Sequence, residues 1–295
     1  MPRLTTDRLS VGTALALIAM FGVTTTFSPV RFDGGEAPPA SCPRPVVGVD
    51  TLLRRRTALL LGELHGTQEA PRFVGDVACR AVERRVPVTI ALELPLEVAS
   101  HITTYVAGAD EAERARARAA IFTSTWQDGR RSQAIAELLD TARALTQRDF
   151  DVRVIPFSAD SAASGQLRDR GMADALAEAF ADSSRMLIML AGNLHVRLRS
   201  GTAITRDYEP AGFLLRRRYP TRTVVSLDMA NDAGSAWLCP SADPKDCGVR
   251  PVRARNPAAP WSVQLSDSLS ATGYHGRFAV GEPHASLPAR GSPVP

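Results

Sequence analysis

The chain has 295 residues, of which 44% are hydrophobic and 22% are charged, so it is an ordinary globular protein with one large domain or two small ones. These fractions exclude a disordered chain and a multi-span membrane protein. The net charge of +4 would suggest an anionic partner, but Lys245 is the only lysine and the arginine clusters at 54–56 and 216–218 have no interleaved aromatics. We therefore expect no nucleic-acid partner.

The N-terminus resembles an export signal. Arg3 and Arg8 precede an apolar stretch at 11–23, which has the length of a signal-peptide core and is short for a transmembrane helix. Because no clean cleavage site follows, residues 1–27 are either a signal peptide or an uncleaved membrane anchor. Residues 28–48 are rich in Pro and Gly and read as a linker. We expect an exported protein, periplasmic or extracellular.

Strands and helices alternate after the linker. This alternation predicts an α/β domain over 49–230, with a mainly parallel sheet, helices on both faces and a helical insertion after the second strand. We expect residues 231–283 to form a small β-rich extension on the same domain and residues 284–295 to form a disordered tail. The expected strands are 57–62, 87–93, 151–157, 186–191 and 221–228; the expected helical segments are 68–85, 95–122, 131–148 and 166–182.

The four cysteines agree with export, because an even number can pair outside the cytosol. Cys239 and Cys247 bracket a turn rich in Pro and Asp, which favours a bond between them and leaves Cys42 to pair with Cys79. Four cysteines allow two other connectivities, and Cys79 could also be a buried free thiol among apolar helical neighbours.

Two Gly-x-x-His motifs, at 62–65 and 192–195, directly follow apolar runs that read as buried parallel strands. A third expected strand ends in Glu93. In such sheets ligands bind beyond the carboxyl ends of the strands, so we expect Glu63, His65, Glu93 and His195 to share one site. A third match, at 281–284, has no strand before it and is interpreted as accidental.

Two imidazoles and a carboxylate (His65, His195 and Glu63) suit a catalytic divalent metal with open positions for water. Glu93 would then serve as the general base or orient a ligating imidazole. The alternative is that each Glu and His form only a buried hydrogen-bonded pair that fixes a turn. The adjacent Arg168 and Asp169 form either a structural ion pair or a support behind the site.

The segments that carry these residues resemble the ChaN-like group within the Tiki/TraB/erythromycin-esterase superfamily. They are LLGELHGTQEAP at 60–71, ALELP at 91–95, RDRGMADAL at 168–176 and IMLAGNLHV at 188–196. The resemblance implies an α/β core in which His65, Glu93 and His195 are signature residues. It also implies that Glu63 is the carboxylate of the first motif and that Arg168, Asp169 and Asn193 support the site.

The resemblance leaves the activity open, because Tiki-like members resemble metal-dependent peptidases, erythromycin esterases hydrolyse a lactone and ChaN-like members bind haem. We expect a metal-dependent hydrolase of an ester or amide bond in a small-molecule or peptide substrate. The alternatives are a haem-binding protein without turnover and a scaffold that keeps these residues for stability. None of the four tyrosines lies in a convincing axial-ligand motif, which favours the hydrolase.

Overall fold

The computed structural model describes residues 42–124, 127–158, 165–202, 205–241 and 243–289. The expected signal or anchor at 1–27, most of the expected linker and the last residues of the expected tail lie outside these ranges. None of the helices in the described part combines the length and apolarity that a membrane crossing requires.

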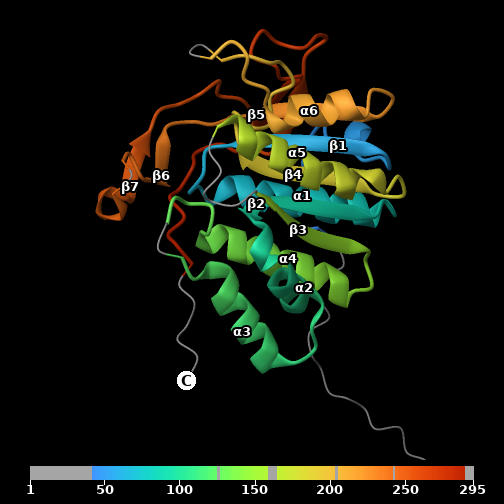
Figure 1. The fold of residues 1–295 in the computed structure, drawn as a ribbon, viewed down its shortest axis with the longest axis vertical. Helices are drawn as coiled ribbons and strands as arrows, with labels where there is room; N and C mark the ends of the chain where they lie inside the picture. The colour runs from blue at the N-terminus through green and yellow to red at the C-terminus, as the bar shows by residue number, and fades with distance from the viewer. Residues whose placement is uncertain (1–41, 125–126, 159–164, 203–204, 242, 290–295) are drawn as a thin grey trace, which may run out of the picture. The chain divides into compact units, whose positions relative to one another are not determined.

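Within the described residues, seven strands form one sheet in the order β3-β2-β4-β1-β5-β9-β8 (Figure 1). All neighbouring strands are parallel except the antiparallel edge pair of β8 and β9. The central strand β1 is buried along its whole length, because helices cover both faces, and its apolar run reflects this. The strands are β1 (Thr57–Glu63), β2 (Val88–Pro95), β3 (Val152–Ser158), β4 (Met186–Gly192), β5 (Thr223–Ala230), β8 (Ser262–Leu265) and β9 (Gly276–Ala279).

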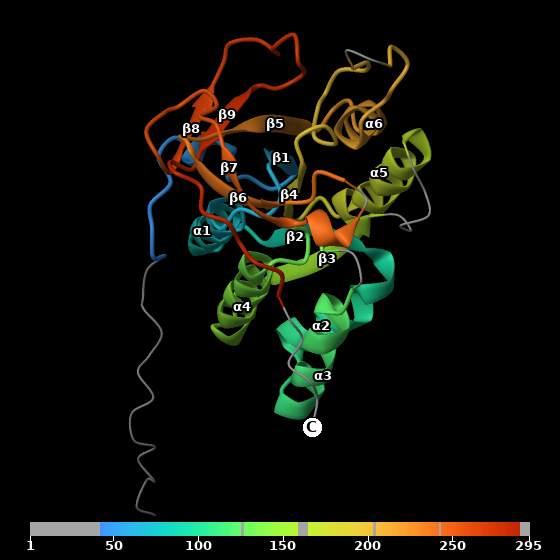
Figure 2. The same ribbon diagram turned by 90° about the vertical axis from the view of Figure 1, so that its left-hand side faces the viewer.

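Helices α1 and α4 lie on one face of the sheet, and α5 and α6 lie on the other (Figure 2). The core divides the same way, since alternate residues of β1 pack against opposite helix layers. The expected insertion after the second strand contains η2, α2 and α3, and α4 corresponds to the separate helix expected at 131–148. The helices are α1 (Glu69–Glu83), α2 (Ala99–Ala107), α3 (Glu111–Phe122), α4 (Gln133–Gln147), α5 (Gln166–Ala181) and α6 (Ala211–Arg218), with 3-10 turns η1 (Asp50–Leu52), η2 (Leu96–Val98) and η3 (Pro244–Asp246).

These features confirm the expected α/β class, but two features differ from the sequence prediction. Strands β8 and β9 join the main sheet. The segment after residue 230 therefore supplies two strands of that sheet and is more than a separate extension. Only β6 (Gly234–Leu238) and β7 (Gly248–Val252) form a separate antiparallel hairpin. Helix α6 lies in a stretch that has no clear periodicity in the sequence.

The expected disorder of 284–295 is wrong for residues 284–289. Backbone hydrogen bonds join this segment to the turn after β1 and to the start of α4. The expected linker likewise ends earlier than residue 48, because Val46 is buried and Val47 pairs with Ser262.

Both favoured disulfides are present, joining Cys42 to Cys79 and Cys239 to Cys247. The first connects the N-terminal arm to α1, and the second closes the β6–β7 hairpin. Two disulfides indicate an oxidising compartment, as expected for an exported protein.

A buried guanidinium group fastens the amino-terminal edge of the sheet. Arg185 is 3% exposed, and its Nη2 donates to the backbone oxygens of Val88 and Asp151 at 2.6 and 3.0 Å. Its Nε donates to the hydroxyl of Thr89 at 3.0 Å. The side chain therefore ties the segments that begin β2, β3 and β4 together.

Candidate functional site

The three strands that end in the expected site residues are neighbours at the centre of the sheet, in the order β2-β4-β1. Their parallel register places Glu63 beside Gly192, at the point where β1 and β4 end together. Glu93 comes from the end of β2, next to β4. The two Gly-x-x-His motifs and Glu93 therefore meet at one edge of one sheet, as the sequence predicts.

The buried carboxylate of Glu63 orients the imidazole of His65. The Nδ1 atom of His65 lies 2.9 Å from Oε1 of Glu63, and its Nε2 atom lies 3.4 Å from Oε2 of Glu93. The Glu63 side chain is 5% exposed, whereas that of His65 is 23% exposed. His65 is thus fixed by one carboxylate and directed at another.

The second imidazole has the same arrangement. The Nδ1 atom of His195 lies 2.9 and 3.0 Å from the two carboxylate oxygens of Asp169, at the start of α5. Asp169 is itself held by the hydroxyl of Tyr208 and by the backbone N–H of Ala211. The Nε2 atom of His195 lies 3.9 Å from Oε1 of Glu93, beyond hydrogen-bond distance.

Glu93 is the centre of the cluster, with a side chain that is 4% exposed. Its Oε2 accepts the backbone N–H of Gly192 at 2.9 Å, and its Oε1 accepts Nη2 of Arg168 at 2.6 Å. Nη1 of Arg130 lies 3.4 Å from the same Oε1, and the Nε of Arg130 donates to Asp128 at 2.8 Å. The carboxylate is thus surrounded by cationic groups.

These charges determine the protonation states. Burial by itself would lower the pKa of His65, but attraction to Glu93 and hydrogen bonds to Glu63 and Glu93 outweigh it and raise the pKa to about 10. Burial would raise the pKa of Glu93, yet the charge and hydrogen bond of His65 and the charge of Arg130 hold that pKa well below its usual range. In the free protein His65 is therefore an imidazolium and Glu93 a carboxylate.

These groups open into a cavity of about 270 Å³. Among the described residues that line it, none carries a hydroxyl or thiol group, so the lining offers acids, bases and guanidinium groups but no Ser, Thr or Cys nucleophile. The lining residues are His65, Glu93, Asp128, Arg130, Arg168, Gly192, Asn193, Leu194 and His195. Both imidazoles line this cavity.

The site does not fit a preformed divalent-metal centre on Glu63, His65 and His195. Imidazoles oriented by carboxylates do occur in metal sites, but the ligand atoms must also converge. Within the described residues, three ligand atoms lie within 4.8 Å of one another only at Cys42, Cys79 and Glu83, and that cysteine pair is a disulfide. The guanidinium groups of Arg130 and Arg168 would also repel a cation.

Haem does not fit either. It requires an axial ligand beside a wide apolar wall, whereas this cavity is small and most of its lining side chains are charged or polar. The hydroxyl groups of Tyr208 and Tyr274, the tyrosines near the site, are already bonded to Asp169 and to the backbone oxygen of Asn193.

The structure brings together all the residues that the sequence placed in the site, with some changes of role. Arg168 contacts Glu93 and Asp169 contacts His195, so they do not pair only with each other. Asn193 lines the cavity and its backbone N–H donates to the backbone oxygen of Glu63 at 3.2 Å. Tyr208 was missed, because no motif surrounds it.

No protein-family model matches the chain, and a search of curated proteins finds no match. Solved structures do match. A succinoglycan biosynthesis protein has a TM-score of 0.59 at 8% identity, covering 84% of this chain and 94% of that protein. An erythromycin esterase variant in its open conformation has a TM-score of 0.56 at 12% identity, covering 82% of this chain and 89% of the esterase.

A Bacillus cereus protein has a TM-score of 0.51 at 10% identity, covering 82% of this chain and 92% of that protein. At these identities the likeness concerns the fold, and it extends over most of both chains in each comparison. The chain therefore shares its fold with these three proteins, one of which is an erythromycin esterase.

Proposed function

We propose that the protein is a hydrolase that adds water to an ester or amide bond by acid–base catalysis. The observation that carries this proposal is a pair of imidazoles, each fixed through Nδ1 by a buried carboxylate, whose Nε2 atoms face the same carboxylate, Glu93. Imidazoles oriented in this way are the usual groups that move protons in hydrolysis. The esterase among the structural neighbours is in keeping with this chemistry.

The proposal gives each group one step. The Nε2 of His195 accepts a proton from water as the water oxygen attacks the substrate carbonyl carbon. The guanidinium groups of Arg130 and Arg168, which line the cavity, stabilise the negative charge that forms on the carbonyl oxygen. His65, an imidazolium in the free protein, donates a proton to the leaving oxygen or nitrogen as its bond to carbon breaks. Proton exchange with solvent then restores both rings.

Glu93 has a different role from the general base that the sequence suggested. A carboxylate that accepts a short bond from Arg168 and has a strongly lowered pKa is a weak base. Glu93 instead stabilises the charge on His65 and holds the guanidinium groups in place.

The test uses the full protein with p-nitrophenyl acetate and a lactone as ester probes, and a short peptide as the amide probe. We expect hydrolysis of at least one class of probe that survives excess chelator, and a loss of about 100-fold or more in kcat for His65→Gln and His195→Gln. The matched control is His101→Gln, an exposed residue of α2, which should retain activity. Loss of activity on chelation with recovery on adding a divalent metal would refute the metal-free mechanism.

The pH profile tests the role of His65 separately. An ionisation near pH 10 should appear in kcat/KM of the unmodified protein and be absent from the residual activity of His65→Gln. A Soret band on titration with haemin, abolished by the same substitution, would support the haem-binding alternative instead.

We also infer that the protein works outside the cytosol, in the periplasm or beyond the cell, with residues 1–27 as its signal or membrane anchor. The disulfides support this location. Fractionation of cells that express the full chain, with mass spectrometry of its N-terminus, would show whether the segment is removed.

A further inference from the structure

Three segments that are distant in the sequence meet at the residue after His65. The backbone oxygen of Gly66 accepts the N–H of Trp237 at 2.9 Å and the N–H of Ser286 at 2.8 Å. Gly66 has a φ of +77°, and a Cβ there would lie 2.1 Å from the backbone oxygen of Trp237. Only glycine allows this approach.

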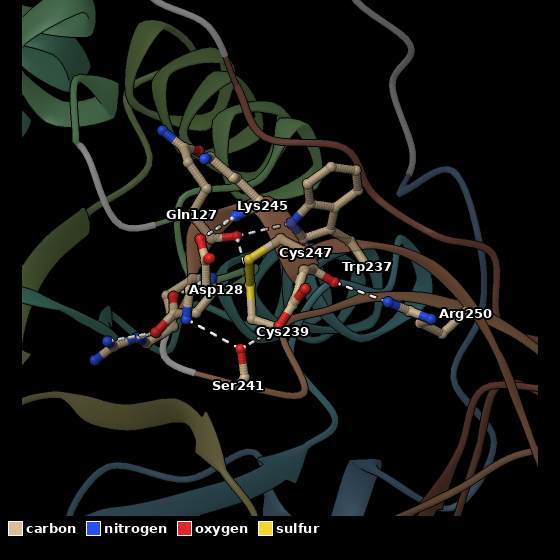
Figure 3. The surroundings of a disulfide bond; sticks show 11 residues. Gln127, Asp128, Trp237, Cys239, Ser241, Lys245, Cys247 and Arg250 are labelled. Carbon is tan, nitrogen blue, oxygen red and sulfur yellow. Dashed lines mark hydrogen bonds and ion pairs between the residues drawn. A yellow bond between two sulfur atoms is a disulfide. The ribbon is translucent and has the colours of Figure 1, made fainter.

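Trp237 also bonds the other loop of the site. Its indole Nε1–H donates to the backbone oxygen of Gln127 at 2.7 Å, as Figure 3 shows. Gln127 begins the loop of residues 127–131, which carries Asp128 and Arg130 into the cavity. The same loop touches the first turn, since a Cβ on Gly129 would lie 2.6 Å from the backbone nitrogen of Gly66.

The hairpin that presents Trp237 is closed by a covalent bond close to it. Trp237 pairs with Val249 in the β6–β7 ladder, and the Cys239–Cys247 disulfide lies just beyond. The Sγ atom of Cys239 is 3.4 Å from the same Gln127 oxygen that the indole contacts (Figure 3). The disulfide therefore sits directly against the loop.

We propose that Trp237 is a positioning residue of the site and that the Cys239–Cys247 disulfide keeps it in place. Through its backbone and its indole, Trp237 sets the spacing between the turn that carries His65 and the loop that carries Arg130. This spacing determines whether Arg130 reaches Glu93, from which it is 3.4 Å away. The catalytic consequence rests on the proposed function.

The first test is Trp237→Phe, which removes the indole N–H and keeps a ring. Its matched control is Trp261→Phe, which removes an equivalent N–H bond, 2.6 Å long, to Asp76. We expect faster deuterium exchange in peptides covering residues 127–131 for Trp237→Phe only. We also expect kcat for the ester probe to fall between about fivefold and 100-fold with a smaller change in KM.

The second test removes each disulfide in turn. Replacing Cys239 and Cys247 by Ser should speed exchange at residues 127–131 and lower kcat in the folded protein. Replacing Cys42 and Cys79 by Ser should lower stability without changing exchange in that loop.

If both tryptophan variants, or both disulfide variants, leave exchange at 127–131 unchanged, the positioning role is wrong. If the exchange difference is found but the unmodified protein hydrolyses no ester or amide probe, the positioning role stands and the proposed function fails. Circular dichroism of every variant confirms that the sheet is intact before either comparison is made.

Discussion

Because His65 is charged in the folded protein, the free energy of unfolding should fall as the pH rises. The pKa of His65 rises from 6.5 to about 10 on folding, so the folded protein binds this proton more tightly than the unfolded chain does. The stabilisation is complete below pH 6.5 and is lost as the pH rises towards 10. A single His65→Gln substitution removes the effect.

The size of the effect follows from the two pKa values. One pH unit of difference corresponds to about 1.4 kcal/mol, so between pH 7 and pH 9.5 the unfolding free energy should fall by roughly 3 kcal/mol. This is a ceiling, because the His65 side chain keeps 23% of its surface exposed and water screens part of the interaction. The lower limit of pH 7 avoids Asp228, whose pKa burial raises to about 6.

The assay is urea unfolding followed by circular dichroism at half-unit steps across this range. The unmodified protein and His101→Gln, altered at an exposed position, should lose stability in parallel. His65→Gln should be less stable at pH 7 and nearly flat above it. Equal slopes for His65→Gln and the unmodified protein would show that His65 carries no buried charge, and the acid role proposed for it would fall with that result.

Three further predictions concern the scaffold. Replacing Cys42 and Cys79 by Ser should lower the unfolding free energy by about 4 kcal/mol, because the bond closes a loop with a sequence separation of 37; a loss below about 1 kcal/mol on urea unfolding would contradict this. Arg185→Met should cost about 3 kcal/mol, since it removes the hydrogen bonds that the buried guanidinium donates to Thr89, Val88 and Asp151, and an unchanged melting temperature would refute that reasoning. Gly66→Ala should lose nearly all activity, because its Cβ would overlap the backbone of the β6–β7 hairpin; normal turnover would show that the turn can relax.

The sequence predicts the sheet well because its strands are buried on both faces. Such strands read as continuous apolar runs, and in β1 and β4 a Gly at the end of the run lies close to where the chain leaves the sheet. The pairing of Glu63 with His65 was foreseeable from their spacing of two. The convergence of β1, β2 and β4 followed from the rule that parallel strands end at the same edge.

The sequence indicated Arg168 and Asp169 as a possible support for the site, but not that they hold Glu93 and His195, respectively. Tyr208 and Arg130 reach the site from irregular segments, whose paths depend on tertiary packing and leave no periodic signal. The poor fit of Glu63, His65 and His195 to a preformed metal centre has a related reason. Residue types set which ligands are available, but only coordinates show that two guanidinium groups face the same cavity.

The third Gly-x-x-His match, at 281–284, has a structural role that its sequence did not predict. It does not line the cavity at the candidate site, yet the Nδ1 of His284 lies 3.0 Å from Oε1 of Glu69, and the His284 backbone oxygen accepts the N–H of Gln68. The match thus helps attach residues 284–289 to the start of α1. A segment that looked like a tail in the sequence is part of the folded domain.

The bonds that reach Gly66 from Trp237 and Ser286 have a consequence for how the protein matures. The acids and bases are encoded in the first two hundred residues, but the groups that set their separation are synthesised last. A chain shortened after Val280 would retain every strand of the sheet and still lack Ser286. The contacts at Gly66 would then be complete only after the segment that carries Ser286 has emerged and docked.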